Sequence, residues 1–158
     1  MIRAHVVRGK NLKSAMGDKN KSKHTSSTFI PIRSSGEILM QLRDDGGGKK
    51  ILYPNAWNFL GGAVEDGENH LEAAVREARE ECDLELDASH YKLIFVYSHD
   101  NTFSDYVYVC EVGESWEPKV NEGRKMRWMK LEEIKKLQLG FEQEKIIPEL
   151  EKFLRTRK

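Results

Sequence analysis

Three glutamates in the middle of the chain have the spacing of a shared helix face. They are Glu77, Glu80 and Glu81, at positions i, i+3 and i+4. Carboxylates held that close together repel one another. A divalent cation that prefers oxygen ligands, Mg²⁺ or Mn²⁺, removes this repulsion, so the spacing indicates a metal site. A solvated acidic helix surface would give the same spacing, and the spacing alone does not choose between the two.

A helix over residues 70–82 is predicted to carry these glutamates. Asn69 followed by Glu72 resembles a capping box, in which each residue satisfies a backbone N–H of the other. A separate apolar stripe follows on the helical wheel at about 60–140° from Glu77. Its members are Leu71, Ala74, Ala78 and Cys82. We therefore expect one face of the helix to pack on the core while another presents the carboxylates.

The glutamates are part of a longer pattern that begins at Gly62. Glu68 follows after five residues, and Arg76-Glu77, Glu80-Glu81, Asp83 and Leu84 complete the pattern. The pattern resembles the signature of the Nudix (MutT-like) hydrolases, G-x5-E-x7-R-E-U-x-E-E-x-G-U, where U is aliphatic. Every fixed position matches except the last glycine, which is Asp83, and Ala78 stands at an aliphatic position.

The resemblance continues on both sides of this pattern. Residues 57–62, WNFLGG, resemble the family's W-x-x-P-G-G with Leu60 in place of proline, and residues 39–43 resemble its preceding strand that ends in a basic residue. Residues 126–131 resemble its late strand running into a short helix. The resemblance covers residues 28–155 and implies the α/β Nudix fold, a mixed β-sheet sandwiched between helices (α/β/α).

The resemblance also implies a function. Members of the family cleave a phosphoanhydride bond in a nucleoside diphosphate linked to another moiety, by attack of metal-activated water on phosphorus. By similarity, Glu77 and Glu81 would bind the metal, with Glu80 as a further ligand or water partner. The main-chain carbonyl around Gly61 or Gly62 would add an oxygen ligand. Arg76 would orient the glutamates through a salt bridge with Glu68.

The two departures leave every carboxylate in place, so we expect an active Mg²⁺-dependent enzyme. Asp83 tolerates the left-handed conformation that glycine adopts after a helix better than most residues, and Leu60 only loosens a turn. The intact glutamates argue against the alternative, a non-catalytic nucleotide-sensing module on the same fold.

The general base and the substrate contacts are less well defined. Glu80 and Glu122 are candidate bases, and Glu111, Glu114 and Glu117 are further options. Arg43, at the end of a predicted strand, is expected to meet a substrate phosphate. Trp57 and Tyr53, beside a predicted turn, are expected to line a pocket and stack on a base.

The remaining elements follow from periodicity and turn signals. Another helix pattern, over Phe141–Arg155, contains Pro148, which should kink or delay the helix. We expect strands at residues 1–8, 28–33, 37–42, 91–98, 105–112 and 125–129, and short helical structure at residues 131–137. Strands interleaved with helices indicate a mixed sheet flanked by helices.

Length and composition limit the classes of protein to which this chain can belong. The chain has 158 residues, 39 % hydrophobic and 33 % charged, enough for one domain over residues 1–158. Residues 9–27 are expected to form a basic flexible loop or arm. The beginning of the chain lacks the apolar core of a signal peptide, and no apolar run is long enough for a membrane span. The two cysteines, Cys82 and Cys110, exclude a disulfide framework and are expected to be buried. These features favour a cytoplasmic protein.

The charge balance bears on partners. The 26 basic and 26 acidic residues cancel, which argues against nucleic acid as the partner. The expected substrate is a small nucleotide diphosphate derivative, and the sequence does not choose among damaged nucleoside triphosphates, nucleotide sugars, dinucleoside polyphosphates and ADP-ribose. A homodimer through the C-terminal helix is an option, although that helix could equally cover the sheet.

Overall fold

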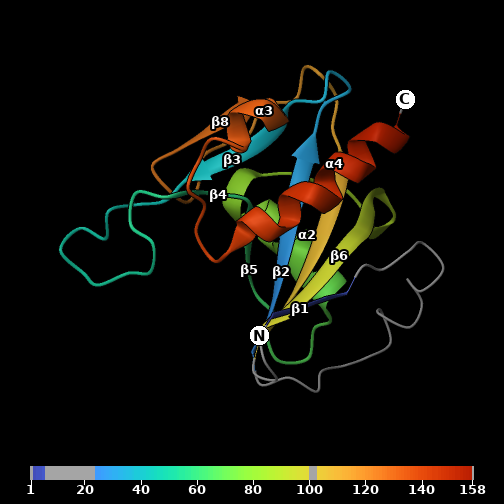
Figure 1. Cartoon of the computed structure of the whole chain (residues 1–158). Coiled ribbons are helices and arrows are strands. Elements are labelled where there is room, and N and C mark those ends of the chain that lie inside the picture. The colour runs from blue at the N-terminus through green and yellow to red at the C-terminus, as the bar shows by residue number, and fades with distance from the viewer. Residues whose placement is uncertain (1, 6–23, 100–102, 158) are drawn as a thin grey trace.

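A mixed β-sheet lies between helices in the computed structural model, as the sequence predicts (Figure 1). The structure describes residues 2–5, 24–99 and 103–157. The strands are β1 (Ile2–His5), β2 (His24–Ile32), β3 (Ile38–Leu42), β4 (Trp57–Asn58), β5 (Leu60–Ala63), β6 (Tyr91–His99), β7 (Phe103–Glu111) and β8 (Lys125–Met129). The α-helices are α2 (His70–Cys82), α3 (Leu131–Ile134) and α4 (Ile147–Thr156), with 3₁₀ turns η1 (Ala88–His90) and η2 (Gln143–Ile146).

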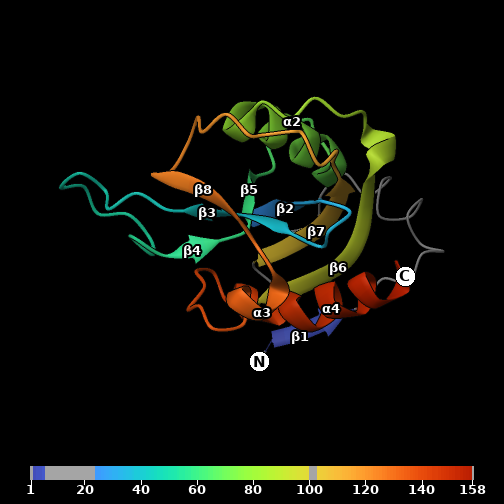
Figure 2. The ribbon, with the colours of Figure 1, turned by 90° about the horizontal axis from the view of Figure 1, so that it is seen from above.

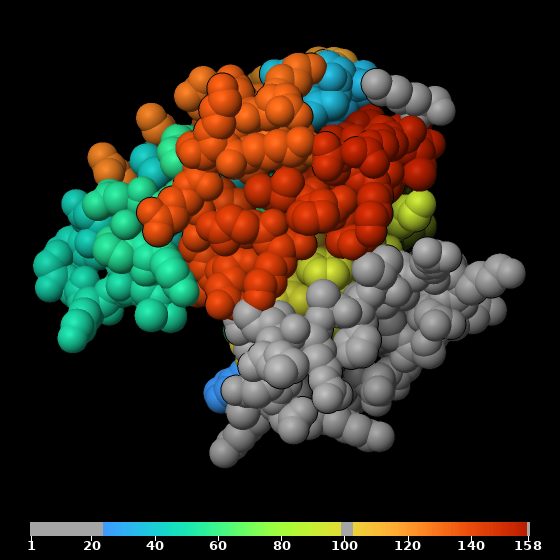
Figure 3. Space-filling model, in the orientation of Figure 1, coloured from blue at the N-terminus to red at the C-terminus, as the bar shows by residue number. Residues whose placement is uncertain are grey.

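The helices form two layers on opposite sides of the sheet. Figure 2 shows α2 on one side and α3 and α4 on the other. In Figure 3, α3, the segment after it and α4 form a continuous surface over their face of the sheet. The sheet runs β1-β6-β7-β2-β3-β4, with β5 on β2 and β8 on β3. The β2–β7 pair is parallel and the other strand pairs are antiparallel.

The sheet divides between β2 and β3. These strands pair at Ile32 and Ile38, beside the turn that joins them. Farther from the turn each strand takes a different partner: β2 pairs with β5 through Ser26–Phe29, and β3 pairs with β4 through Gln41 and Leu42. The sheet therefore divides into two parts that diverge from this turn, which leaves room for a cavity between them.

Helix α2 begins and ends where the sequence predicts. The Asn69 side chain accepts a hydrogen bond from the Glu72 N–H at 2.8 Å, and the Glu72 carboxylate accepts one from the Asn69 N–H at 3.3 Å. Asp83 ends the helix in the left-handed conformation, with φ 56° and ψ 32°. The predicted apolar stripe is buried against the sheet. Both helix ends are thus fixed by local chemistry.

Each face of the sheet has its own apolar core. The α2 side buries Cys82 and Cys110 together with Phe29, Leu60 and Tyr108, as expected for the cysteines, and neither cysteine forms a disulfide. The other side packs Ile146 and Leu150 against strand residues that include Ile30, Ile94 and Val107. The two-sided burial fixes the sheet between the helix layers.

Several predicted boundaries are wrong. The predicted loop over residues 9–27 is incorrect for residues 24–27, which belong to β2, while residues 9–23 lie outside the described part of the chain. The hydroxyl-rich start of β2 is accommodated because Ser26 and Thr28 hydrogen-bond to Asp105. The C-terminal helix begins as η2 and becomes α-helical at Ile147, with Pro148 in the first turn, where a missing N–H costs little.

The short helix also ends early. It stops at Ile134 rather than extending to residue 137, and hydrogen-bonded turns continue the chain from there. Within the described ranges, no helix has the length and apolar character needed to cross a bilayer.

Candidate functional site

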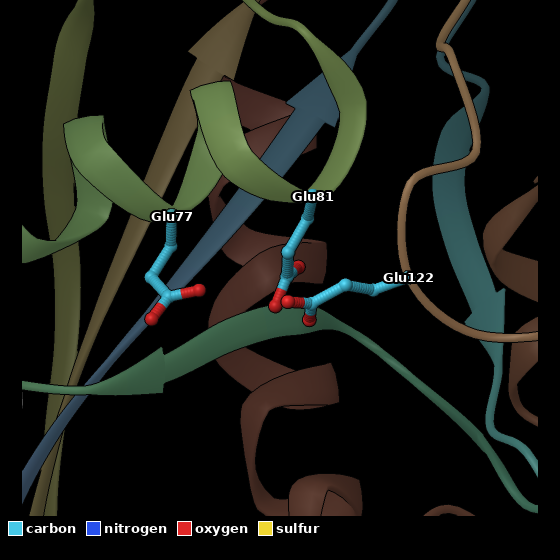
Figure 4. Close-up of side chains that lie close together, drawn as sticks. All are labelled: Glu77, Glu81 and Glu122. Carbon is cyan, nitrogen blue, oxygen red and sulfur yellow. The ribbon is translucent and has the colours of Figure 1, made fainter.

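Three carboxylates from two separate segments of the chain lie close together. Glu77 and Glu81 extend from α2, and Glu122 extends from the loop between β7 and β8 (Figure 4). One oxygen of each residue lies within 4.8 Å of the others. Glu77 is 9 % and Glu81 only 3 % exposed, whereas Glu122 is exposed. Only Glu77 and Glu81 share a helix, so the third carboxylate depends on how the loop is attached.

The loop that carries Glu122 is attached to the C-terminal end of α2. The Asn121 N–H donates to the Glu81 carbonyl at 3.0 Å, and the Lys119 N–H donates to the Cys82 carbonyl at 3.2 Å. The Asn121 amide also donates to the Asp83 carboxylate at 2.7 Å. From the sheet, the Gln41 side chain donates to the Glu122 carbonyl at 3.0 Å. The helix carbonyls left without partners inside α2 therefore hold the loop in place.

Burial and mutual repulsion disfavour the charged form of these carboxylates. Burial raises the pKa of Glu81 far above its usual range, and the neighbouring Glu77 and Glu122 raise it further. Burial likewise raises the pKa of Glu77, although Arg76 opposes that rise. Glu81 Oε2 is buried without a hydrogen-bond partner in the described structure. An oxygen donor set with this unsatisfied buried atom fits a hard divalent cation, which would supply the missing positive charge.

The glycine pair before α2 allows the chain to pass directly beneath the carboxylates. A Cβ on Gly62 would collide with the carboxylate of Glu77, and a Cβ on Gly61 would collide with the backbone of Ser27. The backbone of Gly61 also hydrogen-bonds to Glu81. The backbone contact therefore requires glycine at position 61, whereas a side chain at position 62 would displace the Glu77 carboxylate from its place in the cluster.

Arg76 connects several of the acidic side chains. Its Nη2 lies 2.7 Å from Glu68 Oε1 and its Nε 3.0 Å from Glu68 Oε2, which forms the salt bridge that the family resemblance implies. Its Nη1 lies 2.9 Å from Glu77 and 3.0 Å from Glu80. The hydrogen bonds from Arg76 lower the pKa of Glu68, and those to Glu68 raise the pKa of Arg76. Arg76 thus holds the Glu77 side chain through a direct ion pair.

Glu80 is not brought into the cluster. Its carboxylate pairs with Arg76 instead, and its side chain is 51 % exposed. The other candidate bases lie elsewhere: Glu111 pairs with Arg157, Glu114 accepts from Ser34, and Glu117 pairs with Arg33. Glu122 is therefore the candidate base outside the signature that the structure places beside Glu77 and Glu81.

The predicted substrate contacts divide into two groups. Arg43 lies at the end of β3 and lines a cavity of about 540 Å³ that also contains Glu81 and Glu122. Tyr53 and Trp57 do not line this cavity. Tyr53 packs on the Phe141 ring with centroids 4.7 Å apart, and the Trp57 ring packs against the core with Lys125 5.6 Å from its centroid.

Other residues of the cavity were not predicted. They include Asp105, Thr28, Asn58, Phe141 and Gln143. Polar residues within otherwise apolar strands were the signal available: Asp105 begins a run of β-branched and aromatic residues, and Asn58 lies between Trp57 and Phe59. Their convergence depends on strand order, which periodicity does not reveal.

The fold, the glycine pair and the carboxylates on α2 together define a Nudix domain. The chain belongs to this family, because the family model for the NUDIX domain matches residues 23–150. Human diphosphoinositol polyphosphate phosphohydrolase NUDT4B is 41 % identical over 90 residues, which cover 54 % of this chain and 50 % of that protein. The human 3-beta phosphohydrolase is 39 % identical, over 54 % of this chain and 55 % of its own length. The matches thus span about half the length of these relatives.

Solved structures support the fold. A MutT structure from a study of Aliivibrio salmonicida and Vibrio cholerae has a TM-score of 0.67 at 22 % identity, covering 80 % of this chain and 95 % of that one. An Ap4A hydrolase from C. elegans has a TM-score of 0.63 at 18 % identity, covering 84 % and 98 %. At these identities the likeness concerns the fold alone.

Proposed function

We propose that the protein is a Mg²⁺-dependent hydrolase of a phosphoanhydride bond in a nucleoside diphosphate linked to another moiety. The observation that carries the proposal is the grouping of Glu77, Glu81 and Glu122 within 4.8 Å, with Glu81 and Glu122 lining a cavity. Family membership supports the same reaction class. Mg²⁺ is preferred over softer ions because all three donors are carboxylate oxygens, and Mn²⁺ should substitute.

Each residue has a proposed role. Glu77, Glu81 and Glu122 hold the cation, with the backbone at Gly61 or Gly62 beside them. A divalent cation held there supplies activation of water and neutralises charge on the phosphates. Arg76, held by Glu68, fixes Glu77, and Arg43 binds a substrate phosphate from the end of β3. Glu122, which lies beside Glu77 and Glu81, is also proposed to accept the proton from the attacking water, and Glu80, which pairs with Arg76, is proposed as a further ligand or water partner.

The relatives extend the range of substrates to be tested. Diphosphoinositol polyphosphate and Ap4A, taken from the names of the relatives, both contain phosphoanhydride bonds. We propose to screen them beside nucleoside triphosphates, nucleotide sugars and ADP-ribose, with Mg²⁺ or Mn²⁺. Separation of orthophosphate, pyrophosphate and nucleoside monophosphate would identify the bond that is cleaved.

The variant Glu81→Gln tests the metal site directly. We expect turnover to fall at least about 100-fold, because even residues that only support metal ligands cost 10–100-fold when lost. Glu85→Gln is the matched control, since it removes a carboxylate that pairs with Arg79 on the surface. Turnover that survives in Glu81→Gln would contradict the proposed site. Nucleotide binding without any turnover by the native protein would instead favour the non-catalytic sensing module.

We also propose that residues 1–158 form a single Nudix domain and that the protein can form a homodimer. Light scattering of the full chain would determine the oligomeric state.

A further inference from the structure

The loop after β3 forms part of a second cavity, which adjoins the cavity that contains Glu81, here called the first cavity. The second cavity has a volume of about 700 Å³, and residues 44–47 of the loop contribute to its lining. Gln41, Arg43 and Glu122 line both cavities, so the two adjoin at these residues. Because Glu122 belongs to the carboxylate cluster, the proposed site of bond cleavage borders two spaces, each of a volume typical of sites for small ligands.

Two polar groups at this junction are available to a ligand. Arg43 Nε donates to the Leu52 carbonyl at 3.0 Å, and the guanidinium lies 5.0 Å from the centroid of the Phe141 ring. Its Nη1 and Nη2 have no hydrogen-bond partner among the described residues. Gln41 is only 6 % exposed, and although its amide nitrogen donates to the Glu122 carbonyl, its side-chain oxygen has no partner in the described part of the chain. A ligand that extends from one cavity into the other can bind both groups.

The two cavities differ in the groups that they can bind. Four aromatic residues line the first cavity, namely Phe59, Tyr97, Phe103 and Phe141. Among the described residues that line the second cavity none is aromatic. Aromatic walls are typical of sites for planar ligands. A nucleotide base is therefore expected in the first cavity, and the second cavity is left for the group at the other end of the diphosphate.

The charge of the second cavity bears on that group. Asp44, Asp45 and Glu122 line it, and Arg43 is the only cationic side chain among its described lining residues. A group that carries further phosphates would be repelled there. Residues 49–50 of the same loop are exposed lysines outside the lining, and they offset part of the negative charge, so a cationic group gains little. The lining thus favours an uncharged group.

Asp44 is the carboxylate of this cavity that is most available to a ligand. It is exposed, and its side chain has no hydrogen bond or ion pair within the described residues. One oxygen of Asp45 already accepts from the Gly47 N–H at 2.8 Å. Carboxylate oxygens and the Gln41 side-chain oxygen are acceptors, so they suit a group that offers several O–H donors. A sugar is such a group, and it carries no charge.

We propose that the second cavity binds the sugar of a nucleoside diphosphate sugar, with the base in the first cavity and the diphosphate at Arg43 between them. This inference rests on the proposed function, because the bond to be cleaved must lie at the carboxylate cluster. The oxygen of water bonds to one phosphorus as the bridging P–O bond breaks. The two protons of the water pass to the products or the solvent, and the products are a nucleoside monophosphate and a sugar phosphate.

The inference separates sugar-linked nucleotides from the other candidate substrates. A nucleoside triphosphate or diphosphoinositol polyphosphate would place phosphates in the second cavity, and a dinucleoside polyphosphate would place a second base there. We would measure turnover of ADP-ribose, ADP-glucose, UDP-glucose and GDP-mannose with Mg²⁺, beside ATP, UTP, GTP, Ap4A and diphosphoinositol polyphosphate. For the native protein we expect kcat/KM of the best nucleotide sugar to exceed that of the triphosphate with the same base by about 10-fold or more, since hydrogen bonds to charged acceptors are gained.

Asp44→Ala should lower kcat/KM for the nucleotide sugar by about 10-fold, because a hydrogen bond to a charged acceptor is lost. For the triphosphate kcat/KM should not fall, because removal of a negative charge favours a phosphate. Partial loss of fold would lower both values, so it cannot produce this difference. Asp87→Asn is the matched control, because Asp87 is exposed, lines neither cavity and makes no cap hydrogen bond through its side chain.

Calorimetry in metal-free buffer gives a readout without turnover, and we expect Asp44→Ala to bind the best nucleotide sugar about 10-fold more weakly than the native protein does. Unchanged values for the nucleotide sugar in Asp44→Ala, or an equal fall for sugar and triphosphate, would overturn the inference. Preference of the native protein for triphosphates, Ap4A or diphosphoinositol polyphosphate would reject the sugar site and leave phosphoanhydride hydrolysis intact. Absence of all turnover, together with binding of a nucleotide sugar that weakens in Asp44→Ala, would reject the hydrolysis and support the sugar site. Neither turnover nor binding would overturn both.

Discussion

The buried negative charge of a single residue, Glu81, lowers the stability of the metal-free protein. Its side chain is almost fully buried, and one of its oxygens lacks a hydrogen-bond partner in the described structure. When folding raises the pKa of a carboxyl group, the free energy of unfolding of the protein falls as the pH rises from the pKa in the unfolded chain toward the pKa in the folded protein. The reason is that only the unfolded chain releases the proton in this pH range. The metal-free protein should therefore be less stable at pH 8 than at pH 5 on account of this residue.

Glu81→Gln should remove that penalty. In buffer with EDTA we expect the variant to have a free energy of unfolding at pH 8 about 1–3 kcal/mol above that of the native protein, since one pKa unit corresponds to about 1.4 kcal/mol. The difference should shrink at pH 5. Urea unfolding at both pH values measures it, with Glu85→Gln as the control. Identical pH dependence in native protein and Glu81→Gln would contradict the electrostatic account.

Individual residues also show which parts of the functional site can be predicted from the amino-acid sequence. The spacing of Glu77 and Glu81 predicts their shared helix face because the helix is local. Glu122 was a candidate only by its position before a predicted strand, and its place beside Glu81 depends on loop hydrogen bonds to the end of α2. Tyr53 and Trp57 were expected to line the pocket, but the direction of a side chain in a turn depends on tertiary packing.

At the scale of elements, the junction between α2 and the following loop departs from the family signature. Asp83 replaces a glycine at a left-handed position, and its carboxylate accepts the hydrogen bond from Asn121, the neighbour of Glu122. The substitution therefore gives up some helix-end stability and gains an attachment for the loop.

Asp83→Gly should separate these two effects. We expect its stability to stay within about 1 kcal/mol of the native value, because relief of the backbone conformation offsets the lost hydrogen bond. Turnover and Mg²⁺ affinity should fall by about 10-fold, as for other residues that support metal ligands. Asp83→Asn keeps an acceptor oxygen and should behave like the native protein. Equal impairment of both variants would show that the carboxylate-to-Asn121 contact does not position Glu122.

Elements with strong local signals were predictable from sequence. The capping box fixes the start of α2, and the Lys125–Met129 strand was predicted with its observed bounds. The sequence predicts a loop for the first part of β2 because its Ser and Thr residues resemble turn composition. Their hydrogen bonds to Asp105, which lies far away in the chain, make a strand possible there.

At the scale of the whole molecule, the sheet keeps two cores apart. Leu150 of α4 is fully buried in the core opposite α2 and lines no part of the cavity. Leu150→Ala should lower the free energy of unfolding by about 2–5 kcal/mol. The kcat/KM of the folded fraction should stay unchanged at low temperature, because the α2 layer and the carboxylates are not in contact with the deleted atoms.

Thermal unfolding and activity of the same samples would test this separation. Lys152→Ala is a control on the same helix, since its side chain is exposed and should alter stability by less than about 0.5 kcal/mol. A fall in kcat/KM that accompanies the loss of stability in Leu150→Ala would show that the two layers are coupled through the sheet.

The two buried cysteines give the α2 layer its own chemical reporter. Alkylating reagents attack the thiolate, and burial raises the pKa of Cys82 to about 12 and that of Cys110 above its usual range. Iodoacetamide can therefore label either thiol only after the layer between α2 and the sheet has opened. The rate of labelling thus measures how often that layer opens. Its slowing by Mg²⁺ would report ion binding without any substrate.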